Sequence, residues 1–214
     1  MRIAVLCERR AGERRVAVTP EATGALVVDG HSVVVETGAG AAAGMPDDTY
    51  LAAGASIAPD PAAAIGEGGV VVSVNGPTDR EALGHLGADH VVVGLFDPVW
   101  RPDVAVEVAA TGATMLALDL VPRSTRAQAV DVLSSQATVE GFQSVLLAAG
   151  RLPKMLPLLM TAAGTVPPAR VLVLGAGVAG LQAIATARRL GALVEGFDIR
   201  EEALEQIRSL GAKS

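Results

Sequence analysis

The sequence predicts an α/β protein with two Rossmann-like lobes and mostly parallel sheets, the second lobe being incomplete at the C-terminus. Short β-branched runs alternate with Ala-rich stretches of helical period, which is the pattern of βα units. The runs are apolar throughout, as strands are when helices cover both faces of a sheet. A glycine-rich turn then opens a second βαβ unit near residue 170. The 214 residues are enough chain for two lobes.

Composition excludes several classes of protein. Half of the residues are hydrophobic and 2% are aromatic, so Ala, Val, Leu and Gly must build the core. Seventeen basic against 23 acidic residues give a net charge of −6, which repels phosphodiester backbones and makes nucleic acid an unexpected partner. A single cysteine and an N-terminus without a signal pattern predict a cytoplasmic protein. Glu107 and Asp119 interrupt the apolar stretch 104–121, so we expect no membrane insertion.

The first lobe is expected to span residues 1–124. Its predicted strands are residues 2–6, 32–36, 70–74, 91–95 and 114–118, with a weaker one near Ser56. Thr19-Pro20 predicts a helix start with a capping hydroxyl, and residues 78–81 form a capping box. Gly30 and Gly87 are predicted helix stops.

The pattern changes after Pro122. A long helix is predicted at about residues 125–149, and a segment broken by four prolines follows it. We therefore expect a connector over residues 125–168 and the start of a nucleotide-binding domain over residues 169–214. This domain has a strand at 170–174, a helix at about 178–190 and a strand at 193–197.

The glycine-rich turn is the strongest chemical signal. The sequence Gly175-Ala-Gly-Val-Ala-Gly180 joins the strand to the helix, which is the context that a dinucleotide site requires. Gly175 permits the tight turn, Gly177 lets a pyrophosphate approach the backbone, and Gly180 lets the helix pack on the sheet. The helix N-terminus supplies an anion site.

An acidic residue completes this pattern. Asp198 closes the second strand eighteen residues after Gly180, where a carboxylate accepts hydrogen bonds from the adenosine ribose and repels a 2′-phosphate. This favours NAD(H) over NADP(H), although Arg200 could meet a phosphate. The pattern leaves open a glycine turn without a ligand and a site for another adenosine compound, such as S-adenosylmethionine. The predicted cofactor-binding residues are Gly175, Gly177, Val178, Gly180, Asp198 and Ile199.

A polar constellation lies where the lobes meet in sequence. Gln128, Asp131 and Ser135 recur at spacings of three and four, which predicts one helical face. Periodicity alone describes a solvated face equally well. No His or Cys pair has metal-ligand spacing, so no metal site is expected, and Cys7 is interpreted as a packing residue.

The chain resembles the NAD(H)-binding domain, from the alpha subunit, of proton-translocating NAD(P) transhydrogenase, in the superfamily that includes alanine dehydrogenase. The resemblance runs along nearly the whole chain. The segments that carry it are ERRVAVTP at 13–20, VETGAG at 35–40, residues 121–135, AAGTVPP at 162–168 and VLGAGVAGLQAI at 173–184.

The resemblance implies a function and a set of residues. The implied activity is that of an oxidoreductase and translocase of the Si-specific or proton-translocating type, in which NADH passes hydride to NADP⁺ on a partner domain. The implied partners are an NADP(H)-binding subunit, a membrane-spanning subunit and a second copy of the chain, with the assembly peripheral to the cytoplasmic membrane. The residues implied to contact the nicotinamide and its ribose are Arg123, Gln128, Asp131 and Ser134.

Alanine dehydrogenases resemble the same chain, so amino-acid dehydrogenation is an alternative. Oxidative deamination needs a proton acceptor and a cation beside the nicotinamide, whereas direct hydride transfer between nicotinamides needs only positioning. The dehydrogenases carry Lys where this chain has Asn75 and His where it has Asp97, and no lysine precedes Lys154. Arg15, implied to hold a substrate carboxylate in the dehydrogenases, is retained and is equally consistent with an ion pair.

The chain stops at Ser214, whereas members of the superfamily continue well beyond this point. Three interpretations follow: a fragment of the transhydrogenase subunit, which we favour, a piece completed by a second chain, or a truncated, non-catalytic remnant.

Overall fold

The computed structural model describes residues 1–77 and 79–214. The chain divides into two compact units, unit 1 (Met1–Val130) and unit 2 (Asp131–Ser214).

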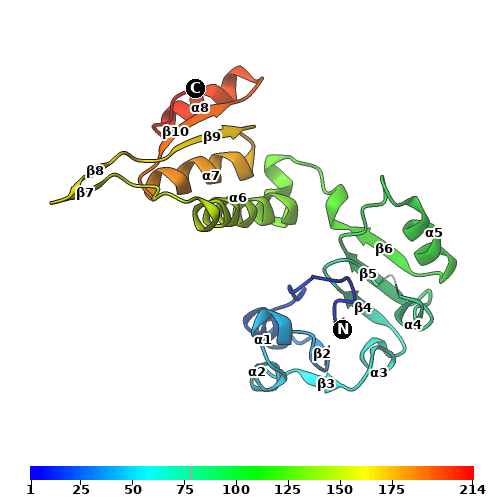
Figure 1. Ribbon diagram of the computed structural model, residues 1–214. Coiled ribbons are helices and arrows are strands. Elements are labelled where there is room, and N and C mark those ends of the chain that lie inside the picture. Colours follow the sequence, from blue (N-terminus) through cyan, green and yellow to red (C-terminus); the bar gives the residue numbers. More distant parts are fainter. Residues whose placement is uncertain (78) are drawn as a thin grey trace. The chain divides into compact units, whose positions relative to one another are not determined.

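Unit 1 is built on one six-stranded sheet in which every pair of neighbours is parallel. Its spatial order is β3-β2-β1-β4-β5-β6 (Figure 1). The winding direction reverses between β1 and β4, which is the switch point of a doubly wound sheet. All six predicted strands are confirmed, and none of their ends differs from the prediction by more than two residues. The strands are β1 (Arg2–Val5), β2 (Ser32–Glu36), β3 (Ser56–Ala58), β4 (Gly69–Val72), β5 (His90–Gly94) and β6 (Thr114–Ala117).

Helices cover both faces of this sheet. They are α1 (Pro20–Val28), α2 (Asp47–Ala52), α3 (Pro61–Ile65), α4 (Arg80–Leu83) and α5 (Pro102–Ala110), with 3₁₀ helices η1 (Ala41–Ala43), η2 (Leu118–Leu120) and η3 (Thr125–Val130). Alternate residues of β1 enter different cores: Ala4 packs with residues of α3 and α4, and Val5 with residues of α1 and α2. The apolar runs therefore mark strands that are buried on both sides.

The predicted helix boundaries are partly confirmed. Thr19 caps α1 by accepting a hydrogen bond from the Ala22 N–H, and Gly30 follows the helix with a φ of 82°. Thr78, the predicted first residue of the capping box, lies outside the described residues, and Asp79 caps α4 through the Ala82 N–H at 2.8 Å. Gly87 as a helix stop was wrong, because α4 already ends at Leu83.

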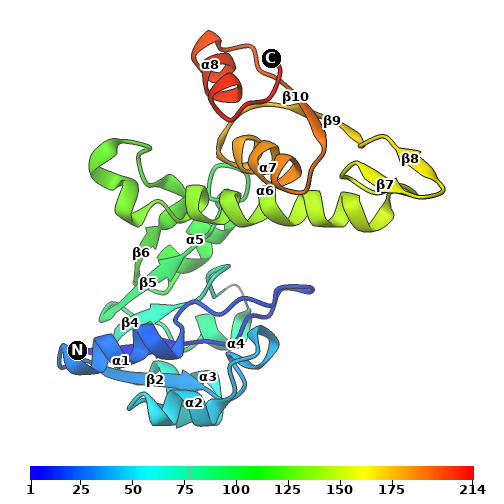
Figure 2. The same ribbon diagram turned by 90° about the vertical axis from the view of Figure 1, so that its left-hand side faces the viewer.

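Unit 2 contains the predicted βαβ unit. Strand β9 (Arg170–Leu174), helix α7 (Val178–Arg189) and strand β10 (Leu193–Phe197) follow one another, and the two strands pair in parallel. Helix α8 (Glu201–Ser209) follows β10, and the long helix α6 (Val132–Arg151) lies against α7 (Figure 2). The core of the unit is centred on Ile184 and Ile207, both fully buried.

The long helix predicted at about residues 125–149 is confirmed in α6, but its predicted start was wrong. The helix predicted from 125 is interrupted: residues 125–130 form η3, and α6 begins only after Asp131, whose carboxylate caps it by accepting from the Ser134 N–H at 3.0 Å. The proline-broken segment holds an antiparallel hairpin of β7 (Leu159–Thr161) and β8 (Gly164–Val166), which extends from the rest of unit 2. Pro157 and Pro167 flank this hairpin, which the sequence analysis did not predict, so these prolines lie just outside its strands.

Among the described residues, no helix is both long and apolar enough to cross a bilayer.

Candidate dinucleotide site and the polar network of unit 1

Unit 2 builds the glycine turn as the motif requires. Gly175 has a φ of 92°, which favours glycine, and its N–H donates to the Phe197 carbonyl at 2.8 Å. A Cβ on Gly180 would overlap the carbonyl oxygen of Gly175, so only glycine lets α7 begin this close to the turn. A Cβ on Gly177, by contrast, would meet nothing within 4 Å. Gly177 therefore faces open space rather than protein.

The N-terminus of α7 provides donors for an anion. Gly177 is its N-cap and supplies no side-chain hydrogen bond, so the first N–H groups of this twelve-residue helix have no capping side chain. Val178, the first helical residue, is 44% exposed. Because the helix dipole is positive at this end, a phosphate in front of Gly177 would be stabilised without any basic side chain. The residues present fit the diphosphate of a dinucleotide.

Asp198 lies at the carboxyl end of the neighbouring strand and holds the turn from the side. Its Oδ2 accepts from the Ala176 N–H at 2.7 Å. The hydrogen bonds that Arg200 donates, followed by that of Ala176, hold the pKa of the Asp198 carboxyl far below its ordinary value. Asp198 is therefore a carboxylate at every physiological pH, as recognition of a ribose hydroxyl requires. Ile199, the next residue, is 91% exposed.

Two of the residues predicted to contact the nicotinamide, Asp131 and Ser134, lie at the start of unit 2. The Asp131 residue is 9% exposed, and its carboxylate accepts from both the N–H and the Oγ of Ser134, the latter at 2.7 Å. The pair is thus brought together by the helix cap. The capping hydrogen bonds hold the side chains of Asp131 and Ser134 in a fixed geometry.

The other two predicted contacts belong to unit 1. Arg123 follows η2 and is exposed, and Gln128 lies in η3. The predicted single helical face of Gln128, Asp131 and Ser135 was wrong, because the helix breaks at Asp131 between the first and last of these residues. Periodicity could not reveal the break, since a capping aspartate fits a polar helical face equally well.

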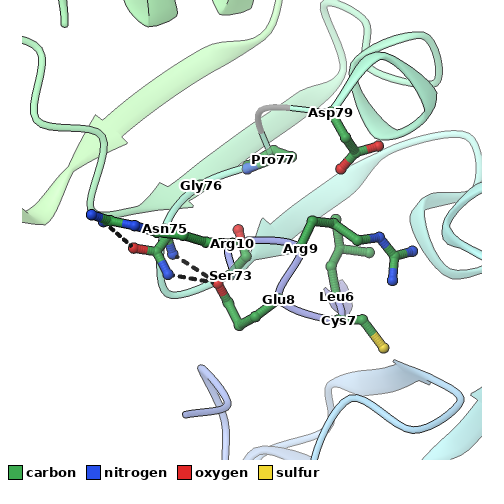
Figure 3. Close-up of a pocket in the computed structure, with 10 residues that line it drawn as sticks. All are labelled: Leu6, Cys7, Glu8, Arg9, Arg10, Ser73, Asn75, Gly76, Pro77 and Asp79. Carbon is green, nitrogen blue, oxygen red and sulfur yellow. Dashed lines mark hydrogen bonds between the residues drawn. The ribbon is translucent and has the colours of Figure 1, made fainter. Parts of the chain in front are cut away.

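The carboxyl ends of β1 and β4 hold a polar network that the sequence did not reveal. Glu8 accepts from the Val74 N–H and from the Asn75 side chain, the latter at 2.9 Å. The Asn75 amide also accepts from Arg10 at 3.2 Å, and Figure 3 shows its bonds to Arg10 and Glu8. The same amide donates to Glu13 at 2.9 Å. This edge is the switch point of the sheet, where ligands of doubly wound folds bind. The available signal was that Glu8 and Asn75 each follow a predicted strand, but only the fold makes these two strands neighbours.

Glu13 links this network to Arg15. Its two carboxylate oxygens accept from Nε and Nη2 of Arg15 at 2.9 and 2.7 Å, and this pairing lowers the Glu13 pKa to about 2. Arg15 is therefore held by a carboxylate of its own chain. The ion pair left open by the sequence is present.

The pocket beside this network is small. Its cavity volume is about 20 Å³, room for about one water molecule, and Ser73 in its wall is 4% exposed. Asn75 has an amide that neither gives up nor takes a proton near neutral pH. Asp97 is exposed and has a φ of 51°, uncommon for a residue other than glycine, and its N–H donates to Asp119. The described residues contain no group of three or more His, Cys, Asp or Glu side chains that could hold a metal ion.

Comparison with known proteins confirms the family resemblance. Residues 4–140 match the family described as "Alanine dehydrogenase/PNT, N-terminal domain", and residues 144–214 match "Alanine dehydrogenase/PNT, C-terminal domain". The chain belongs to the alanine dehydrogenase/PNT family.

Relatives named as transhydrogenases are the more similar ones among those compared. A protein of Rhodospirillum rubrum, named as the first portion of NAD(P) transhydrogenase subunit alpha, is 46% identical over 219 residues, which cover 100% of this chain and 56% of the relative. Alanine dehydrogenase of Bacillus subtilis is 29% identical, over 97% of this chain and 54% of that protein. The chain thus spans little more than half the length of these relatives.

Of the two solved structures compared, the transhydrogenase is again more similar to this chain than the alanine dehydrogenase. The crystal structure of transhydrogenase from Sinorhizobium meliloti superimposes with a TM-score of 0.95 at 44% identity, covering 100% of this chain and 63% of that one. An L-alanine dehydrogenase gives a TM-score of 0.84 at 29% identity, covering 98% and 58%. The fold predicted from the sequence, an α/β fold with parallel sheets, is confirmed.

Proposed function

We propose that the chain is the NAD(H)-binding component of a proton-translocating NAD(P) transhydrogenase. The observation that carries this proposal is the turn of unit 2, in which an uncrowded Gly177 and an uncapped N-terminus of α7 adjoin the ionised Asp198. The similarity to subunits named NAD(P) transhydrogenase subunit alpha supports it. The cofactor is NAD(H), held at its diphosphate by the glycine turn and at its adenosine ribose by Asp198.

NADH, when bound, supplies a hydride from C4 of its ring to C4 of NADP⁺ on a partner domain, so that two electrons and one hydrogen nucleus pass together. The chain needs only to bind and orient the ring and to exclude water. Arg123 and Gln128 orient the nicotinamide carboxamide and ribose, and the capped pair Asp131 and Ser134 fixes them. Gln128→Ala should therefore slow hydride transfer more than it weakens NADH binding.

The network of unit 1 supports transhydrogenation over amino-acid dehydrogenation. A dehydrogenase needs a titratable group and a cation free to meet the substrate carboxylate. Asn75 cannot exchange a proton near neutral pH, and Arg15 is paired with Glu13. Asn75 and Arg15 both bind the Glu13 carboxylate of their own chain rather than the carboxylate of a keto acid.

The proposed partners are an NADP(H)-binding subunit and a membrane-spanning subunit, with the chain itself forming a homodimer. Proton translocation belongs to the whole assembly, at the cytoplasmic side of the membrane. The similarity to relatives whose names describe only a portion of subunit alpha supports a divided assembly of this kind.

The test mixes the purified chain with a recombinant NADP(H)-binding partner and follows NADH-dependent reduction of an NADP⁺ analogue. Reduction that requires both proteins supports the proposal. NADH oxidation with pyruvate and ammonia, in the absence of the partner, would replace it with the dehydrogenase alternative. NADH binding without either reaction would identify a non-catalytic remnant.

A further inference from the structure

Among the residues that the structure describes, the guanidinium of Arg200 is the one charged group that contacts both Asp198 and the glycine turn. Its Nε donates to Asp198 Oδ1 at 3.0 Å and its Nη2 to Asp198 Oδ2 at 3.1 Å. The same Nη2 donates to the Ala176 carbonyl at 3.3 Å. Two parallel contacts to one carboxylate give both strength and a fixed orientation.

The two members of this pair differ in exposure. The Asp198 side chain is 8% exposed, whereas that of Arg200 is 62% exposed. Asp198 is thus anchored within the turn, and Arg200 covers it from the solvent side. A group that approaches the carboxylate from solvent meets the guanidinium at the same place.

This geometry matters for the choice of nucleotide, because the adenosine ribose of NAD(H) carries a 2′-hydroxyl where that of NADP(H) carries a 2′-phosphate. A carboxylate accepts from the hydroxyl and repels the phosphate. An arginine does the reverse, since its fork of donors matches phosphate oxygens. The chain holds both groups within hydrogen-bond distance of each other.

We propose that Arg200 is a second determinant of nucleotide choice: paired with Asp198 it is withheld from a 2′-phosphate, and without the Asp198 carboxylate it binds one. This inference rests on the proposed function, because it assumes that the adenosine ribose of a dinucleotide lies at Asp198. It extends that function by assigning Arg200, for which the glycine motif provides no role. Discrimination then depends on a cation that the Asp198 carboxylate occupies, and not on repulsion of the 2′-phosphate by that carboxylate alone.

The experiment compares the full chain with D198N, D198N/R200K and D198N/R200Q by titrating each with NADH and with NADPH. The amide introduced by D198N keeps an oxygen that can accept from the Ala176 N–H, so the turn loses charge but not its hydrogen bond. The wild-type chain should prefer NADH. The D198N chain should gain NADPH affinity by about tenfold or more, the strength of one hydrogen bond between charged groups.

The decisive comparison is between the two double variants. D198N/R200K keeps the cation and should retain most of the NADPH affinity of D198N, whereas D198N/R200Q should lose it, about tenfold or more. NADH affinity should agree within about threefold across the three variants, because none carries the carboxylate. Equal NADPH affinity of D198N and D198N/R200Q would overturn the role of Arg200 and leave the NAD(H) site standing.

The single variant R200Q provides the same test with the carboxylate in place. Removing the guanidinium leaves Asp198 unneutralised, so any residual NADPH affinity of the wild-type chain should fall by about fivefold or more while NADH affinity changes less. An unchanged ratio of the two affinities would overturn the inference, even if the D198N variants fail to fold. A folded wild-type chain that binds neither nucleotide would overturn the proposed function and this inference together.

Discussion

Gly177→Ala should separate dinucleotide binding from folding. Gly177 has a φ of −78° and a ψ of −169°, which alanine adopts readily, and its added Cβ would meet no protein atom within 4 Å. The substitution changes an N-cap from glycine to the less favourable alanine, so we expect a loss of about 1 kcal/mol or less in the free energy of unfolding. The fold should remain intact.

Binding should respond much more strongly. The methyl group occupies the space in which a diphosphate approaches the backbone of the turn, so the charge-assisted hydrogen bonds from the start of α7 are lost or lengthened. A loss of one such bond is about 1.5–3 kcal/mol, which corresponds to NADH binding that is weaker by about 10- to 150-fold. Titration of NADH fluorescence with wild-type chain and variant, together with thermal unfolding of each, measures both effects.

A matched substitution controls for the added methyl group. Gly150 is an exposed residue of α6 with open space around it, so Gly150→Ala should raise stability by about 0.5–1 kcal/mol and leave NADH affinity unchanged. If Gly177→Ala binds NADH within about twofold of the wild-type chain, the diphosphate does not lie against this turn and the reasoning fails.

Three further predictions concern stability and reactivity. Gly141 packs against the backbone of Ala179, so a methyl group added at this position would overpack the contact. Gly141→Ala should therefore lower the free energy of unfolding in denaturant by about 1–2 kcal/mol, because the cost of overpacking exceeds the gain in helix propensity. A stabilised variant would contradict this contact. Because the folded Glu13 carboxyl has a pKa of about 2 against an ordinary 4.5, its pairing stabilises the chain above pH 4.5 and is lost as the pH falls toward 2. Glu13→Gln should thus lower the free energy of unfolding at pH 7 by about 1–2 kcal/mol, a value reduced to allow for the solvent exposure of Arg15. It should also flatten the dependence of stability on pH between pH 4.5 and 2, and an unaltered dependence would exclude this pairing. Burial, assisted by Glu36, raises the pKa of the Cys7 thiol to about 11, so alkylation by iodoacetamide at pH 8 should be about a hundredfold slower in the folded chain than in urea, and equal rates would show that the thiol is not buried.

The strands and the glycine turn were predictable because local chemistry decides them. Apolar β-branched runs form strands wherever helices cover both faces, and the spacing of Gly175, Gly177 and Gly180 between a strand and a helix has few other uses. Thr19 as a helix cap follows from its own side chain and the proline after it. These features need only residues that are neighbours in the chain.

What only the tertiary structure decided are the contacts between segments distant in sequence. The meeting of Glu8 with Asn75 requires that β1 and β4 be adjacent, which depends on the order of strands in the sheet rather than on the residues of either strand. The hydrogen bond between the Asp198 carboxylate and the Ala176 N–H likewise requires that β9 and β10 be neighbours. The break of the predicted helix at Asp131 is a local contact with Ser134, but the sequence does not distinguish a capping aspartate from one on a polar helical face. A carboxylate in a sequence specifies a charge, but its partner, and thus its role as cap, ligand or ion pair, is set by the fold that surrounds it.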